Sequence, residues 1–168
     1  MAGRAVAFRP DEILKVLEQH RVRYVLIGGL AASLHGAGTV TLDVDIVPDS
    51  SPSNLTRLSA ALDELGARIR VNGIEGGLAF RHDAGSLRSM DVINLVTDHG
   101  DLDVAFHPSG IPAFSEWDSR AEEAEALGVH FRLASLADVI RSKEAAGRPK
   151  DRITLPVLRQ LLSRQKRG

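Results

Sequence analysis

Two aspartates, Asp43 and Asp45, occupy alternate positions in an otherwise apolar segment. Side chains two residues apart on a β-strand point to the same face, so both carboxylates should stand together while Leu42, Val44 and Ile46 face a core. Two carboxylates about 7 Å apart repel each other by roughly 2 kcal/mol at an effective dielectric near 20. A cation relieves that repulsion, and oxygen ligands suit Mg²⁺ first and Mn²⁺ second. The alternative is an exposed strand edge that binds nothing.

A pair of glycines, Gly28 and Gly29, ends the apolar run Tyr24–Ile27 fifteen residues before the acidic segment. A strand that turns into a helix at two glycines leaves backbone N–H groups free, and the helix dipole favours an anion there. The glycines could also serve only to permit a tight turn. The Walker A and Rossmann patterns are both absent. Together, the glycine turn and the carboxylate pair predict a site for a metal-bound nucleoside triphosphate.

A third carboxylate would complete a site for two metal ions. Asp101 and Asp103 form another alternating pair, followed by Val104 and Phe106. Asp103 lies inside the apolar run, whereas Asp101 could belong to the preceding turn, so we expect Asp103 to be the third ligand or the general base. The choice between the two depends on strand register. A solvated strand residue is the alternative interpretation of Asp103.

The hydrophobic pattern predicts an α/β (α+β) fold with a mixed β-sheet flanked by helices. We expect one domain over residues 1–168, closed by helices within 135–164. The predicted helices are 11–20 with Asp11 as its cap, 30–35, one from Ser51-Pro52 to Gly66, 115–127, 135–146 and 151–164. The predicted strands are 22–27, 41–48, 67–71, 78–81, 92–96, 102–106 and 129–133, with 72–77 as a loop and 82–89 as turns. The inward residues of the last helix should be Ile153, Leu155, Leu158, Leu161 and Leu162.

Composition narrows the function classes. The chain has 168 residues, a net charge of −1 and no cysteine, which excludes disulfides and thiolate metal sites and gives no global basic field. Its six histidines lack zinc-site spacing. No apolar run reaches the length of a membrane span, and the first residues are too few for a signal peptide. We therefore expect a cytoplasmic protein with no membrane partner.

The combined motifs resemble the nucleotidyltransferase superfamily with the DNA polymerase β-like fold, and within it the AbiEii and MenT-like toxins of toxin–antitoxin systems. The resemblance covers most of the chain and is weakest at 72–90 and 110–130. It is carried by Gly28-Gly29-x-Ala-x-x-x-His35-Gly36, by Thr41-x-Asp43-x-Asp45, by Asp103, and by Ser135-Leu-x-Asp138-x-Ile140-x-x-Lys143-x-x-x-Gly147-Arg148-x-x-Asp151.

The resemblance implies a minimal polymerase β-like enzyme that moves a nucleoside monophosphate from an NTP to a hydroxyl acceptor with Mg²⁺. The implied metal ligands are Asp43, Asp45 and Asp103, which with Lys143 are also the implied catalytic residues. The implied nucleotide-binding residues are Gly28, Gly29, Thr41, Lys143, Arg148 and Asp151. Without the resemblance, Lys143 and Arg148 could be ordinary cations near a helix C-terminus.

The implied acceptor is the 3′ end of tRNA, and the implied partner is a cognate antitoxin. An antibiotic- or protein-modifying enzyme and a non-catalytic nucleotide-binding module of the same fold are the alternatives. The C-terminal cations Arg159, Arg164, Lys166 and Arg167 could bind RNA phosphates or form a solvated end.

Two threonines qualify this interpretation. Relatives often carry an arginine where this chain has Thr39, so Lys143 or Arg148 would have to supply the missing cation. A phosphate on Thr41 would repel the neighbouring carboxylates and close the site, which makes Thr41 a candidate for regulation.

Overall fold

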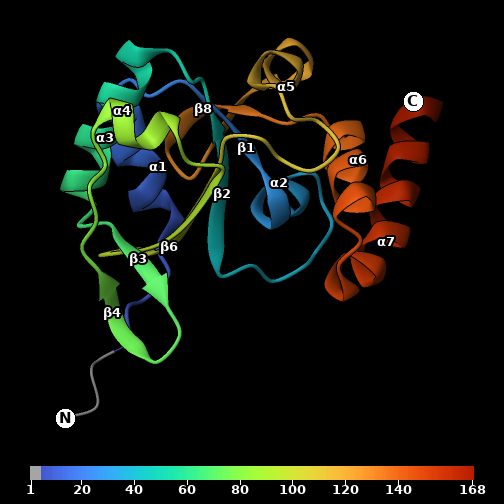
Figure 1. Ribbon diagram of the computed structural model, residues 1–168. Coiled ribbons are helices and arrows are strands. Elements are labelled where there is room, and N and C mark those ends of the chain that lie inside the picture. The colour runs from blue at the N-terminus through green and yellow to red at the C-terminus, as the bar shows by residue number, and fades with distance from the viewer. Residues whose placement is uncertain (1–4) are drawn as a thin grey trace.

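The computed structural model describes residues 5–168, which form an eight-stranded mixed sheet with helices on both faces (Figure 1). The strand order is β4-β3-β5-β6-β2-β1-β8-β7. Only β2–β6 and β1–β8 are parallel, and the other neighbours are antiparallel. The strands are β1 Tyr24–Ile27, β2 Asp43–Pro48, β3 Arg68–Val71, β4 Ile74–Leu78, β5 Val92–Thr97, β6 Gly100–Ala105, β7 Glu122–Ala126 and β8 Val129–Leu133.

The helices divide between the two sides of the sheet. Figure 1 shows α1, α3 and α4 on one side and α2, α5, α6 and α7 on the other, with α7 packed against α6. Their bounds are α1 Pro10–Gln19, α2 Gly28–Leu34, α3 Pro52–Glu64, α4 Ala84–Arg88, α5 Phe114–Arg120, α6 Leu136–Ala146 and α7 Pro149–Arg167. Within residues 5–168, no helix combines the length and the apolar character that a membrane span requires.

The acidic strand β2 alternates as predicted, except at its start. Val44 and Ile46 are fully buried against the core, while Asp43 and Asp45 lie on the opposite face. The prediction that Leu42 also faces the core is wrong, because its side chain is 71% exposed. Leu42 precedes the first paired residue of β2, so it lies outside the alternation that the sheet imposes.

The predicted helix over 115–127 is wrong in its second half. Helix α5 ends at Arg120, and Glu122–Ala126 forms the edge strand β7, which pairs with β8 through a turn at Leu127 and Gly128. Glutamate and alanine favour helices locally, but pairing with β8 overrides that propensity. The glutamates of β7 also protect the sheet edge from pairing with another chain.

Four other features differ from the prediction. Strand β4 spans residues 74–78, where a loop over 72–77 and a strand over 78–81 were expected, and 84–88 form the short helix α4. The N-cap of α1 is Arg9 and not Asp11. On α7, Leu155 and Leu158 are buried as predicted but Ile153 is 80% exposed, because a residue two positions from Leu155 lies about 200° around the helix axis.

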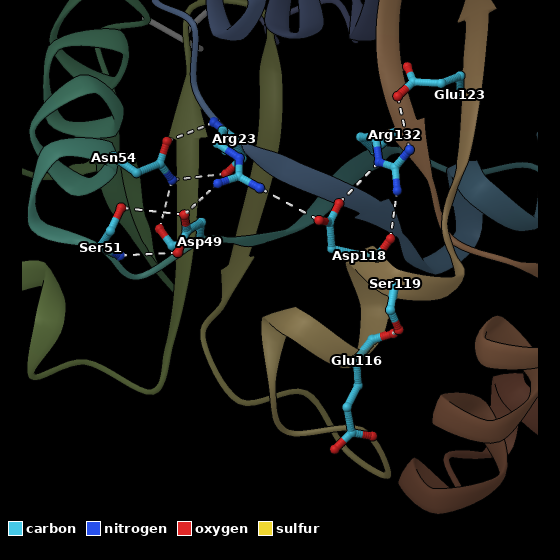
Figure 2. Close-up of polar contacts among 9 residues, drawn as sticks. All are labelled: Arg23, Asp49, Ser51, Asn54, Glu116, Asp118, Ser119, Glu123 and Arg132. Carbon is cyan, nitrogen blue, oxygen red and sulfur yellow. Dashed lines mark hydrogen bonds and ion pairs between the residues drawn. The ribbon is translucent and has the colours of Figure 1, made fainter.

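An ionic network fastens α5 to the sheet (Figure 2). Asp118 of α5 accepts from Arg132 Nε at 3.0 Å through its side chain and from Arg132 Nη2 at 2.6 Å through its backbone carbonyl. Arg23 lies between Asp118 at 3.6 Å and Asp49 at 3.3 Å. Helix α5 thereby holds Trp117, which is fully buried and lines the central cleft described below.

Candidate active site

Three carboxylates converge where the parallel strands β2 and β6 lie side by side. Asp45 of β2 is in register with Asp103 of β6, and Asp43 with Asp101. Asp43, Asp45 and Asp103 each offer an oxygen within 4.8 Å of the other two. The structure therefore brings together all three residues that the sequence singled out as metal ligands.

Arg70 of β3 contacts both acids of β6, Asp101 and Asp103. Its Nη1 lies 2.9 Å from Oδ2 of Asp101, and its Nη2 lies 2.9 Å from Oδ1 of Asp103. Asp101 belongs to β6 and not to the turn, yet it stays outside the group of converging oxygens. The structure thus places Asp103, and not Asp101, in the group with Asp43 and Asp45.

The carboxylate cluster carries more negative charge than its surroundings offset. Burial, followed by the charges of Asp43 and Asp103, raises the pKa of Asp45 to about 8. Burial also raises the pKa of Asp103 to about 6, although Arg70 opposes the shift. Three oxygen donors that repel one another fit a hard divalent cation such as Mg²⁺.

The glycine turn makes room for this cluster. Gly28 has a φ of +72°, and a Cβ built there would overlap the Asp45 carboxylate. Helix α2 begins at Gly28 rather than at the predicted Leu30, and it is only seven residues long. The role of Gly28 is therefore steric, since any side chain there would displace Asp45.

Thr41 lies beside the cluster and supports it. Its Oγ1 donates to the carboxylate Oδ1 of Asp43 at 3.1 Å and lies 3.2 Å from the Asp43 carbonyl oxygen. A Cβ on Gly29 would come within 3.1 Å of the same hydroxyl oxygen. The hydroxyl thus orients Asp43, and Gly29 leaves space for it.

The opposite wall of the site is cationic and comes from the junction of α6 and α7. Lys143 Nζ lies 3.4 Å from Oδ1 of Asp151, and Arg148 Nε donates to Oδ2 of Asp151 at 2.9 Å. Burial alone would raise the pKa of Asp151, but the hydrogen bond and charge of Arg148, together with Lys143, lower it. Asp151 is fully buried and does not line the cleft, so it orients the two cations from behind.

The two walls enclose a cleft of about 550 Å³. Gly28, Gly29, Thr41, the three aspartates, Lys143 and Arg148 all line it, as does Thr39. Of the C-terminal cations, Arg159 pairs with Glu144 at 3.0 Å. Neither Arg159 nor Arg164, Lys166 or Arg167 lines the cleft.

Lys150 is a cleft residue that the sequence analysis did not single out. It lines the cleft from the first turn of α7, and its charge lowers the pKa of Asp45. Also in the lining of the cleft, His107 Nδ1 lies 3.1 Å from Oδ1 of Asp91. The signal for Lys150 was its place between Arg148 and Asp151, but only the packing of α7 brings it to the carboxylates.

Comparisons with known proteins agree with this geometry. Residues 8–162 match the family described as nucleotidyltransferase of unknown function, DUF6036. The comparison with curated proteins gives no match.

Three solved structures share the fold at low sequence identity. The lincosamide antibiotic adenylyltransferase LnuA, bound to lincomycin, superposes with a TM-score of 0.60 at 15% identity over 94% of this chain and 99% of its own. The antibiotic-resistance factor ANT(2″)-Ia gives 0.59 at 16% identity over 92% and 83%. A Thermotoga maritima protein assigned as a nucleotidyltransferase gives 0.55 at 17% over 94% and 96%. Because the family match spans most of its length, the chain belongs to the DUF6036 family of nucleotidyltransferases.

Proposed function

We propose that the protein uses Mg²⁺ to move a nucleoside monophosphate from an NTP to a hydroxyl group, with the 3′ end of tRNA as the acceptor. One observation carries the proposal: three carboxylates converge within 4.8 Å on one wall of a cleft whose other wall carries Lys143, Arg148 and Lys150. A metal-bound triphosphate needs both walls, because the metal requires anionic oxygens and the phosphates require cations.

The acidic wall and the cationic wall of the cleft suit the two halves of the proposed reaction. The acceptor oxygen forms a bond to the α-phosphorus, the bond from that phosphorus to the bridging oxygen breaks, and pyrophosphate leaves. Divalent ions held by Asp43, Asp45 and Asp103 would offset phosphate charge and lower the pKa of the attacking hydroxyl. Asp103 acts as ligand or takes up the hydroxyl proton, and the cations of α6 and α7 stabilise the departing pyrophosphate.

The charge of α7 supports a nucleic-acid acceptor. This helix carries six lysine and arginine residues against one acid, Asp151, which is buried. The helix starts at the cleft with Lys150 and extends away from it, so a polyanion that reaches the metal site can follow it. The resemblance of the motifs to toxins that modify tRNA supports the same acceptor, growth arrest as the consequence and an antitoxin as the partner.

An antibiotic hydroxyl is the second candidate acceptor. LnuA and ANT(2″)-Ia, which share this fold, are an antibiotic adenylyltransferase and an antibiotic-resistance factor. Asp91, which lines the cleft, could pair with a cationic drug, but it already contacts His107. Among Phe, Tyr and Trp, the described cleft offers Trp117 alone, which is fully buried, so a drug would find little surface for stacking.

The test is transfer of label from each of the four α-labelled NTPs, with Mg²⁺, to total tRNA, to lincosamide and aminoglycoside antibiotics, and to the protein itself. Label on tRNA that is lost when its 3′ hydroxyl is oxidised supports the proposal. Label on an antibiotic alone would favour the second candidate. No transfer to any acceptor, with a folded wild-type protein, would reject enzymatic turnover on these substrates.

The toxin role has its own test. Inducible expression in bacteria should stop growth, and Asp43→Asn should restore it at equal protein levels. Normal growth with abundant, folded wild-type protein would contradict the toxin role while leaving the chemistry open to the transfer assay.

A further inference from the structure

One arginine reaches the acidic site from a strand two positions away in the sheet. Arg68 of β3 pairs with Val96 of β5, and Val96 pairs with Asp101 of β6, so these side chains share a face. Alternation along β3 and β6 places Arg70 and Asp103 on that same face. The Arg70 guanidinium extends over β5 and touches both acids of β6.

The two contacts of Arg70 differ in kind. Nη2 donates a hydrogen bond to Oδ1 of Asp103 at 2.9 Å, whereas Nη1, also 2.9 Å from Oδ2 of Asp101, makes an ion pair without hydrogen-bond alignment. Directional hydrogen bonds fix a carboxylate more strictly than a charge contact does. Arg70 thus orients Asp103 through an aligned hydrogen bond and holds Asp101 at the same distance.

Arg70 also stands alone in this role. Among residues 5–168, it is the one cation within 4.0 Å of a carboxylate of Asp43, Asp45 or Asp103. Its side chain is 32% exposed and that of Asp103 is 16% exposed, so solvent screens the contact only in part. Without Arg70, Asp101 would become a fourth unpaired acid beside the site.

We propose that Arg70 is a positioning residue for nucleotidyl transfer. By holding Oδ1 of Asp103 and drawing Asp101 aside, it leaves the second oxygen of Asp103 free to act with Asp43 and Asp45 and keeps Asp101 from binding metal. The inference rests on the proposed function, because it presumes that these three carboxylates hold the ions.

Removal of Arg70 should change metal affinity and turnover in opposite directions. Loss of a nearby positive charge should tighten Mn²⁺ binding about threefold to tenfold, because a carboxylate site attracts a cation more strongly when a competing cation is absent. A misplaced third carboxylate should lower kcat about 100-fold while KM for the NTP changes less than about threefold. A general loss of folding would instead weaken both.

The experiment compares Arg70→Gln, Arg70→Lys and Arg68→Gln with the wild type. Arg68 is the matched control, because it lies on the same strand and face but donates to the carbonyl oxygen of Gly76 at 2.9 Å. Mn²⁺ binding is titrated by electron paramagnetic resonance without nucleotide, and transfer kinetics are measured with Mg²⁺. Arg70→Lys keeps the charge but not the two-pronged geometry, so it should bind Mn²⁺ like the wild type with a kcat in between.

The double variant Arg70→Gln/Asp101→Asn separates positioning from charge. If Asp101 intrudes once Arg70 is gone, removal of its charge should recover at least about tenfold of the lost kcat. Turnover of Arg70→Gln within about threefold of the wild type would overturn the inference, as would a joint loss of turnover and Mn²⁺ binding. The proposed function itself fails on a different pair of results: the wild type transfers no label, and the Asp103→Asn variant binds Mn²⁺ as tightly as the wild type.

Discussion

The molecule contains two ionic clusters that treat charge differently. In the α5 network of Figure 2, Arg23 and Arg132 form ion pairs with three acids, Asp49, Asp118 and Glu123. In the cleft, Arg70 contacts Asp103 and Asp101, whereas Asp43 and Asp45 have no cation within 4.0 Å among residues 5–168. The first cluster joins a helix to a sheet. The second has four carboxylates beside one arginine, so it keeps an excess of negative charge.

The pairing of acids with cations distinguishes a ligand-binding site from a structural ionic network. Each acid of the α5 network lies within 3.6 Å of Arg23 or Arg132, so these acids need no bound cation. The cleft has surplus acid on β2 and β6 and surplus base at Lys143, Arg148 and Lys150 on the facing wall. Opposite surpluses across one cleft fit a ligand that brings both a cation and phosphates.

The largest effect should come from removing an acid of the cleft. Asp43→Asn or Asp45→Asn should lower turnover at least about 1000-fold, because a neutral amide holds a divalent ion weakly. The same change should raise the melting temperature without metal, since it removes like-charge repulsion. Label transfer and thermal melting in EDTA measure the two. A lower melting temperature would show that the acids stabilise the fold, which would contradict the distinction between the cleft acids and the structural α5 network.

Gly28→Ala should give the next largest effect. Its new Cβ overlaps the Asp45 carboxylate at a positive φ, so we expect turnover to fall about 100-fold. Gly29→Ala is the matched control, because its Cβ meets Thr41, with Oγ1 at 3.1 Å and Cβ at 3.3 Å, and not Asp45, and its φ lies outside the positive range. Equal losses in the two variants would show that the turn matters for a reason other than the position of Asp45.

Much of this site could be predicted from the sequence, because local patterns encode it. The Asp43 and Asp45 alternation needs only a strand, and the turn at Gly28 needs only a residue without a side chain. The choice of Asp103 over Asp101 needed the pairing of β3 with β5 and of β5 with β6, which brings Arg70 to Asp101. No local pattern contains that register.

The missed elements share one cause. Strand β7 looks helical in isolation and becomes a strand only because β8 offers it an edge. Lys150 looks like a helix-start lysine and becomes a cleft residue only because α7 packs on α6. In both cases, contacts between residues distant in sequence or on neighbouring elements override what the local sequence favours.

A pH titration of stability should sharpen the contrast. The pKa values of Asp45 and Asp103 rise to about 8 and about 6 from an ordinary 3.8. Between about pH 4 and pH 8 the folded state therefore binds more protons than the unfolded state, and its stability falls as pH rises through that window. We expect the melting temperature in EDTA to fall by about 5 °C from pH 5 to pH 8. Mg²⁺ should abolish most of that fall, and Asp45→Asn should flatten it.

The smallest effect should come from the α5 network, and it should be confined to stability. Asp118→Asn weakens contacts to Arg132 at 3.0 Å and Arg23 at 3.6 Å, so we expect a loss of about 1 kcal/mol in the free energy of unfolding. Denaturant melts at equal pH measure it. Glu116→Gln is the control on the same helix, since Figure 2 shows its carboxylate directed away from Arg23 and Arg132. Turnover per folded molecule should stay within about twofold in both variants. If Asp118→Asn instead lowered turnover as strongly as Asp43→Asn without loss of stability, the α5 network would belong to the active site. The pairing of each acid with an arginine would then not separate a structural cluster from a ligand-binding one.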